Sequence, residues 1–263
     1  MRRTMGMGLA VVALAAALVA CSDDNDTSRG EAREGRGSPA KAELRAYCAK
    51  VLDVETVPFP QVGEQPDAER AATFTEYASR LRALVDEVVA VAPARTKADH
   101  AVVAGALGEV VKAGGDLTKR GTPEVRAAAA RTHAFDLASC GWSQVNTAGL
   151  EYAFERFPES VPSGVVSFEL VGKGDEAHVL ELYRVNDDVT ASGRQIFDGG
   201  VPSKEDLAQV TDLGAAFAQP GDRGYVVRDL QPGRYVAACL ISLGTEPLTT
   251  HATKGMLAEF EVT

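Results

Sequence analysis

The chain changes its hydrophobic period once, and this change limits the folds that it can adopt. Up to Asn146 the apolar residues recur every three to four positions, the spacing of one face of an α-helix. After Asn146 they alternate with polar residues, as in Val166–Leu170 (VSFEL), which is the spacing of a half-buried strand. The sequence therefore predicts an α+β chain with a helical bundle domain at 39–146 and a β-sandwich domain at 147–263.

The helical part contains four amphipathic segments joined by short loops. Ser38 and Pro39 are typical of an N-cap and a first helical residue, whereas Pro93 and Gly141 are typical of helix ends. The predicted helices begin at Pro39, span Asp67–Val91, span Lys97–Lys119 and run from Thr122 to Cys140. Four such helices predict a small bundle.

The second half predicts short strands separated by turns. Alternation extends through Leu150–Glu155 and Val166–Leu170, and the turn signals lie at Gly172–Asp175 and Gln231–Gly233. One short helix is expected at 202–210, because Ser203 and Asp206 there have the spacing of a capping box. This half is expected to form a β-sandwich or a barrel.

The N-terminus has the pattern of a secretory signal. Arg2 and Arg3 precede an apolar run at 8–20, which as a helix would reach roughly 20 Å and would not cross a hydrocarbon core of ~30 Å. The run ends in Leu18–Cys21 (LVAC), which resembles a bacterial lipobox. The resemblance implies cleavage after residue 20 and lipidation of Cys21. An ordinary cleavable signal followed by a chance cysteine is the alternative.

The residues after this signal are polar and predict a flexible tether at 21–38. Two or three acyl chains such as palmitate on Cys21 would anchor the protein stably in the lipid bilayer, because a single chain binds only marginally. The expected location is therefore extracytoplasmic, lipid-anchored to the cell membrane. That compartment is oxidising and permits disulfides.

Charge and motifs exclude several classes of function. The chain has 27 Lys and Arg against 37 Asp and Glu, so a net charge of −10 repels phosphate backbones, and we expect no nucleic-acid partner. It contains no G-x-S-x-G, H-E-x-x-H or P-loop motif. We therefore do not expect an enzyme.

The four cysteines cannot all be paired in disulfides if one of them carries lipid. With Cys21 assigned to lipid, Cys48, Cys140 and Cys239 remain, an odd number in an oxidising compartment. Cys48 and Cys140 lie on helices that are neighbours in an antiparallel bundle, so we predict a disulfide between them that closes a loop of about 90 residues. Cys239 is then free. A pairing of either cysteine with Cys239 would require a contact between the domains and stays the alternative.

Four residues of the β half form a set of soft and borderline metal ligands. Strand parity places His178 on the same face as Leu182, and Cys239 and Met256 on faces that point into the sandwich. With His251 they make two imidazoles, one thiolate and one thioether, the set used by blue-copper sites. The alternative to a metal site is that these residues have structural roles only: a histidine in a loop is usually solvated, a lone cysteine is usually a small buried residue, and a methionine at a strand start usually belongs to the core. His100 and His133 lack metal-ligand spacing and are expected to be structural or exposed.

Residues 149–263 resemble the cupredoxins, the plastocyanin-like copper proteins. Gly174–His178 (GDEAH) is similar to the loop before the first copper ligand of that family, and Leu230–Cys239 (LQPGRYVAAC) to the turn and strand that lead to the cysteine ligand. His251–Val262 (HATKGMLAEFEV) is similar to the H-x4-M ending and last strand. The resemblance implies a Greek-key β-sandwich and one copper ion, with His178, Cys239, His251 and Met256 as its ligands.

Two features depart from the family pattern. Eleven residues separate Cys239 from His251, so residues 240–250 are expected to form an extra loop before His251 returns to the thiolate. Val179 stands where the family often has an asparagine that braces the cysteine loop.

The resemblance implies electron transfer or copper handling with a redox or envelope protein as partner, because four protein ligands leave no position open for substrate. The alternative is a metal-free cupredoxin-like module that holds another envelope protein.

Overall fold

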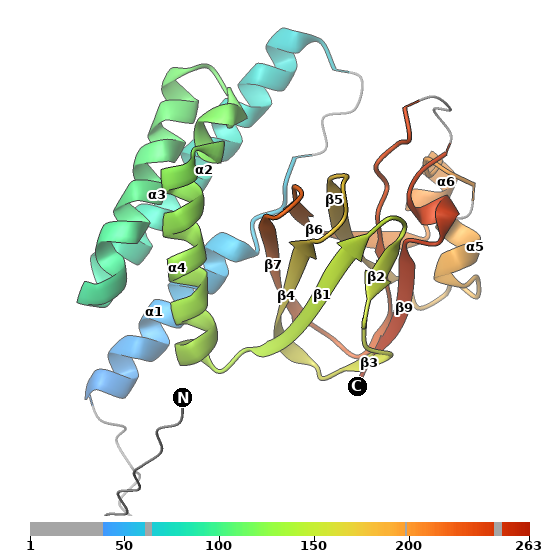
Figure 1. Cartoon of the computed structure of the whole chain (residues 1–263). Helices are drawn as coiled ribbons and strands as arrows, with labels where there is room; N and C mark the ends of the chain where they lie inside the picture. The colour runs from blue at the N-terminus through green and yellow to red at the C-terminus, as the bar shows by residue number, and fades with distance from the viewer. Residues whose placement is uncertain (1–38, 61–64, 198, 245–248) are drawn as a thin grey trace, which may run out of the picture. The chain divides into compact units, whose positions relative to one another are not determined.

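The computed structural model describes residues 39–60, 65–197, 199–244 and 249–263, which form one compact unit (Figure 1). The predicted signal at 1–20, the tether at 21–38, Cys21 and the Ser38 cap lie outside the described residues. Within the described part, no helix has the length and apolar character needed to span a bilayer.

Four α-helices make up the first part of the described chain. They are α1 (Pro39–Glu55), α2 (Asp67–Val91), α3 (Ala94–Lys112) and α4 (Pro123–Cys140), with a 3₁₀ turn at Leu117–Gly121. The bounds of α2 and α4 are as predicted. The predicted third helix at 97–119 is wrong at both ends: α3 starts directly after Pro93, and Gly114 and Gly115, which are weak helix formers, follow its end.

Contacts along the apolar stripes hold the helices together. Ala78, Leu81 and Val85 of α2 pack against Leu107 and Val110 of α3. The predicted disulfide between Cys48 and Cys140 is confirmed, and it links α1 to the end of α4 across 92 positions of sequence. In the chain-entropy model such a loop stabilises the fold by about 4 kcal/mol.

Two sheets form the second part (Figure 1). One sheet has the strand order β2-β1-β4-β7, and the other has the order β3-β9-β8-β5-β6. The strands are β1 (Ser143–Leu150), β2 (Ala153–Glu155), β3 (Ser160–Val161), β4 (Gly164–Gly172), β5 (His178–Val185), β6 (Val210–Ala218), β7 (Arg223–Leu230), β8 (Gly233–Ala238) and β9 (Leu257–Val262).

The connections between the sheets have Greek-key crossovers. Strand β4 pairs antiparallel with β7, although the antiparallel pair β5 and β6, which lies between them in sequence, belongs to the other sheet. Two pairs are parallel, β1 with β4 and β3 with β9. The predicted α+β class, with helices followed by a β-sandwich, is confirmed.

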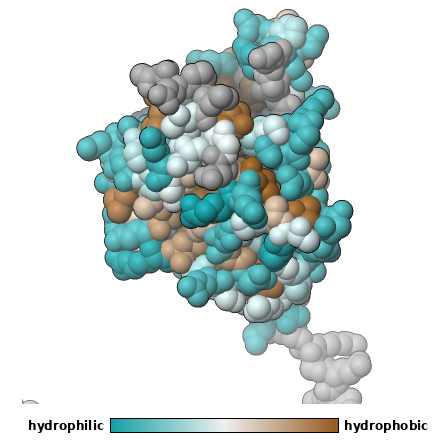
Figure 2. All heavy atoms as spheres, turned by 90° about the vertical axis from the view of Figure 1, so that its right-hand side faces the viewer, coloured by the Kyte–Doolittle hydropathy of each residue, from teal (hydrophilic) through white to brown (hydrophobic). Residues whose placement is uncertain are grey.

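The core lies between the two sheets, and one sheet is covered on its outer face as well. Phe168, Leu180 and Phe260 are buried between the sheets. On the other face of β5 and β8, Tyr183 and Val236 pack with α5 (Gly193–Phe197). Figure 2 shows the side of the molecule that faces right in Figure 1, where hydrophobic and hydrophilic residues are interspersed.

Three local predictions differ from the structure. The alternation at Leu150–Glu155 predicted a continuous strand, but the chain turns at Glu151 and Tyr152. Strand β2 then folds back and pairs antiparallel with β1. Strand structure begins at Ser143, ahead of the predicted change of period. Helix α5 was not predicted; its five residues are too few to show a helical period.

The predicted short helix in the β half is present as α6 (Lys204–Leu207). Ser203 and Asp206 form the expected capping box, in which each side chain accepts from the backbone N–H of the other residue.

Candidate metal centre

The four predicted ligands lie at one end of the sandwich, at the ends of strands. His178 is the first residue of β5, and Cys239 directly follows the last residue of β8. His251 and Met256 lie on either side of a 3₁₀ turn at Ala252–Lys254, just before β9. Their exposed fractions are 0% for His178, Cys239 and Met256 and 1% for His251, so the sandwich shields all four from solvent.

The long segment between Cys239 and His251 forms the extra loop that the sequence predicts. Its two arms pair as antiparallel backbone, with a bridge between Ser242 and Thr250, while residues 245–248 lie outside the described part. The N–H of His251 donates to the carbonyl of Ile241 at 3.0 Å, and the N–H of Ala252 donates to the carbonyl of Cys239 at 2.8 Å. Pairing of the arms therefore returns His251 to the side of Cys239, whatever the length of the loop.

Two further backbone bonds fix Met256 to the same group. The N–H of Cys239 donates to the carbonyl of Met256, and the N–H of Met256 donates to the carbonyl of His251, each at 3.0 Å. The Met256 side chain packs in one buried cluster with Cys239 and Val179. The backbone thus holds Cys239, His251 and Met256 as one unit, and β5 supplies His178.

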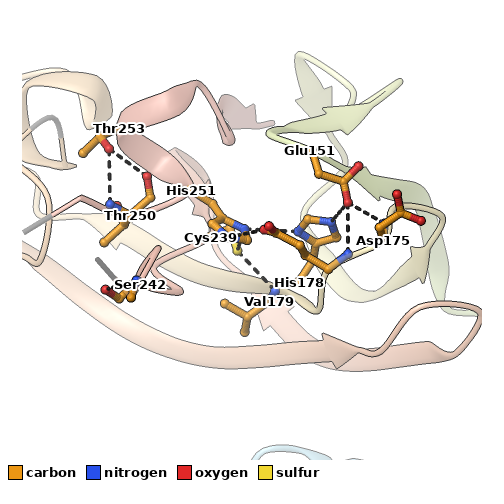
Figure 3. A network of polar contacts seen from close by, with 11 residues as sticks. Glu151, Asp175, His178, Val179, Cys239, Ser242, Thr250, His251 and Thr253 are labelled. Atoms are coloured by element: carbon orange, nitrogen blue, oxygen red, sulfur yellow. Dashed lines mark hydrogen bonds and ion pairs between the residues drawn. The ribbon is translucent and has the colours of Figure 1, made fainter. Parts of the chain in front are cut away.

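The side chains of His178, Cys239 and His251 converge (Figure 3). The ligand atoms of His178, Cys239 and His251 all lie within 4.8 Å of one another. His251 Nδ1 lies 3.3 Å from His178 Nδ1 and 3.5 Å from Cys239 Sγ. The Nδ1 atoms therefore face the common centre, and the Nε2 atoms face away from it.

Burial keeps the Cys239 thiol and the His251 ring neutral when no cation is present. It raises the pKa of the Cys239 thiol to about 11. Burial and the neighbouring His178 lower the pKa of His251, so this imidazole is uncharged at neutral pH. A neutral imidazole such as that of His251 is ready to bind a metal, whereas Cys239 must release a proton when its sulfur becomes a ligand.

The donor set fits copper. A thiolate and a thioether are soft ligands, and two imidazoles with one cysteine and a weak axial methionine are the ligand set of blue-copper centres. The pair of Nδ1 atoms 3.3 Å apart also fits a cation, because in the Nε2–H tautomer each presents a lone pair to the other. Among the described residues this is the one group of three His, Cys, Asp or Glu side chains with such convergence.

Carboxylates and one backbone amide surround these donors. Glu176 Oε2 lies 3.1 Å from His251 Nε2, and Glu151 Oε1 lies 3.7 Å from His178 Nε2. The N–H of Val179 points at Cys239 Sγ at 3.4 Å, so the backbone of β5 contacts the sulfur although Val179 has no polar side chain. The Tyr152 and His251 rings pack edge to face, with the ring centroids 4.9 Å apart.

Sequence reasoning did not single out Glu151 and Glu176. Glu176 lies within the GDEAH motif, two positions before His178, and this is the one local signal for it. Glu151 lies in a stretch whose alternation predicted an exposed strand residue, and only the turn that follows β1 brings it to the centre.

The other two histidines are structural, as the sequence indicates. His100 is buried and its Nε2 lies 2.8 Å from the Tyr47 hydroxyl. His133 Nε2 lies 3.1 Å from the Ser167 hydroxyl, and its ring packs on Tyr225. Both have partners within the protein.

Comparisons by sequence gave no match, either to a protein-family model or to a curated protein. Among solved structures the chain is similar to reduced auracyanin from Roseiflexus castenholzii, with 16% identity and a TM-score of 0.34 over 46% of this chain and 97% of that one. Auracyanin B gives 22% identity and a TM-score of 0.31 over 46% and 88% of the two chains.

Auracyanin A, described as a blue copper protein from Chloroflexus aurantiacus, gives 15% identity and a TM-score of 0.30 over 46% of this chain and 98% of that one. Multicopper oxidases also match, over 46% of this chain. With TM-scores below 0.5, these likenesses add nothing to what the side chains themselves indicate.

Proposed function

We propose that the chain is an extracytoplasmic, lipid-anchored protein whose β-sandwich binds one copper ion for electron transfer or copper handling. The observation that carries the proposal is the buried convergence of His178, Cys239 and His251 within 4.8 Å. Met256, in the same buried cluster as Cys239, would supply the fourth donor, a thioether sulfur.

The chemistry that such a centre supplies is exchange of one electron between Cu(II) and Cu(I), with one protein as donor and another as acceptor. Burial excludes water from the thiolate, and four protein ligands leave no coordination position for a substrate. An electron carrier or copper carrier therefore fits this site better than an enzyme.

Titration of the purified full-length chain with Cu(II), followed by visible absorption, tests the copper centre. We expect an intense thiolate-to-copper band that saturates at one equivalent. A colourless Cu(I) site would appear instead in a competition assay with a Cu(I) chelator. If neither experiment detects binding to the folded protein, the metal-free scaffold is the correct function.

The proposed location depends on Cys21. The Cys48–Cys140 disulfide supports an oxidising compartment, and the LVAC motif supports lipidation. Cys21→Ala should move the protein from the membrane fraction to the soluble extracytoplasmic fraction of the producing cells. If the substituted and unsubstituted chains fractionate alike, Cys21 is not the anchor.

A further inference from the structure

The outer nitrogen of each proposed histidine ligand faces a carboxylate that comes from a different loop. Figure 3 labels one of the two pairs, Glu151 and His178. Glu176 lies on the β4–β5 loop and Glu151 on the β1–β2 turn. His251 Nε2 and Glu176 Oε2 are 3.1 Å apart, a hydrogen-bond distance, although the Glu176 side chain is 47% exposed while that of His251 is 2% exposed. The carboxylate therefore reaches from the surface to a buried ring.

Glu151 holds the loop that carries Glu176. Its Oε1 accepts the backbone N–H of Asp175 at 2.6 Å and that of Glu176 at 3.0 Å. The loop lies so close to this carboxylate that a Cβ on Gly174 would come within 2.1 Å of Oε1, so a side chain there would displace it. The Glu151 carboxylate thus fixes the backbone of the loop from which the Glu176 side chain extends.

The same Glu151 oxygen also lies near His178. His178 Nε2 is buried and has no hydrogen-bond partner among the described residues, and Glu151 Oε1 lies 3.7 Å from it. The ring is held against β1, because a Cβ on Gly149 would lie 2.8 Å from the His178 Cδ2 atom. Glu151 therefore sits between the His178 ring and the loop of Glu176.

We propose that Glu176, placed by Glu151, is a positioning residue that accepts the Nε2–H of His251 and so keeps the Nδ1 lone pair of that ring directed at Cys239 and His178. A neutral imidazole carries one proton, and an acceptor at one nitrogen leaves the other free to bind a metal. The inference deepens the proposed copper function and rests on it for its purpose, but the tautomer itself exists without metal.

The carboxylate has a second effect on a bound cation. A hydrogen-bonded carboxylate makes the imidazole a stronger donor, and loss of such partners typically weakens metal binding 10–100-fold. Its negative charge favours Cu(II) over Cu(I), so its removal should raise the reduction potential. If the substitution weakens Cu(II) binding tenfold more than it weakens Cu(I) binding, the reduction potential should rise by ~59 mV.

Three variants of the full-length chain separate these effects. Glu176→Ala removes both the acceptor and the charge, and Glu176→Gln keeps an acceptor oxygen but removes the charge. Asp175→Ala is the matched control, because it removes a carboxylate from the neighbouring exposed position. All three changes are on the surface loop, so the fold should be retained.

The first measurement is the tautomer of His251 in the metal-free protein, by two-bond ¹H–¹⁵N correlation of its ring. We expect the Nε2–H form in the unsubstituted chain, in Asp175→Ala and in Glu176→Gln, and a mixture of tautomers in Glu176→Ala. The second measurement is Cu(II) affinity, expected to fall 10–100-fold in Glu176→Ala and less in Glu176→Gln, with Asp175→Ala unchanged.

The inference is overturned if Glu176→Ala matches Asp175→Ala in both tautomer and affinity. Failure of the proposed function looks different. In that case the unsubstituted chain binds no copper in either oxidation state, and the tautomer comparison alone decides whether Glu176 positions His251.

Discussion

Two groups of buried polar side chains in the described part of the chain, one among the helices and one at the ends of strands, differ in how their hydrogen bonds are met. In the helices, the Tyr47 hydroxyl donates to Asp136 at 2.6 Å and lies 2.8 Å from His100 Nε2. Between the strands, the Nδ1 atoms of His178 and His251 face each other. The first group completes itself, whereas the second brings together two Nδ1 atoms that, in the Nε2–H tautomers, present lone pairs that a cation would satisfy.

Burial acts on the electrostatics of the two groups in the same direction. Burial raises the pKa of Asp136 to about 7, and the Asp136 carboxyl is held by its bond from Tyr47. Burial likewise raises the pKa of the Cys239 thiol to about 11, even though the backbone N–H of Val179 points at the sulfur. Side chains that satisfy one another mark a structural cluster, whereas converging donor atoms mark a metal site.

The largest expected effect comes from removing the thiol. Cys239→Ser should abolish the thiolate-to-copper band, because no other described cysteine is free. His133→Gln, which changes a buried histidine elsewhere in the chain, should keep the band. The comparison between the two polar groups breaks down if the serine variant retains the band or if the glutamine variant loses it while still folded.

Loss of the disulfide should have the next largest effect. The double change Cys48→Ala and Cys140→Ala should lower the free energy of unfolding by about 4 kcal/mol, because it releases a closed loop and so raises the entropy of the unfolded chain. Urea unfolding of both proteins measures this. Copper binding per folded molecule should not change, and a loss of binding would mean that the helices help to shape the centre.

His133 should make stability depend on pH. Burial lowers its pKa from 6.5 to about 4 in the folded protein, so between these values the unfolded chain binds more protons. The contribution of His133 to stability should therefore fall as the pH falls from ~6.5 to ~4, by up to about 3 kcal/mol, while the raised pKa of Asp136 acts in the opposite direction. Urea unfolding of the unsubstituted chain and of His133→Gln at several pH values isolates the contribution of His133 as the difference between the two slopes. An equal slope in both proteins would assign the pH dependence to other groups.

The smallest expected effect comes from the helical cluster. Tyr47→Phe removes the hydroxyl that contacts both His100 and Asp136, leaving two buried polar groups without it. We expect a loss of about 2 kcal/mol in the free energy of unfolding and an unchanged copper band. A change smaller than ~0.5 kcal/mol would show that water or repacking replaces the hydroxyl.

Local sequence signals were sufficient for much of the fold. The apolar spacing predicted the extent of α2 and α4, and Pro93 and Gly141 predicted where these helices end. The Ser203–Asp206 capping box predicted α6. The Cys48–Cys140 pair followed from the odd number of cysteines and the neighbouring helices. Each of these depends on residues close in sequence or on a small number of possible pairings.

The sequence by itself determined the candidate donors, because His178, Cys239, His251 and Met256 could be chosen from strand parity and the H-x4-M spacing. Only the tertiary structure decided that they converge, since this requires the arms of the 240–250 loop to pair and β5 to lie beside β8. It also decided which acidic residues matter. Of the 37 in the chain, Glu151 and Glu176 reach the outer nitrogens of the histidines, because a turn and a loop far apart in sequence meet there.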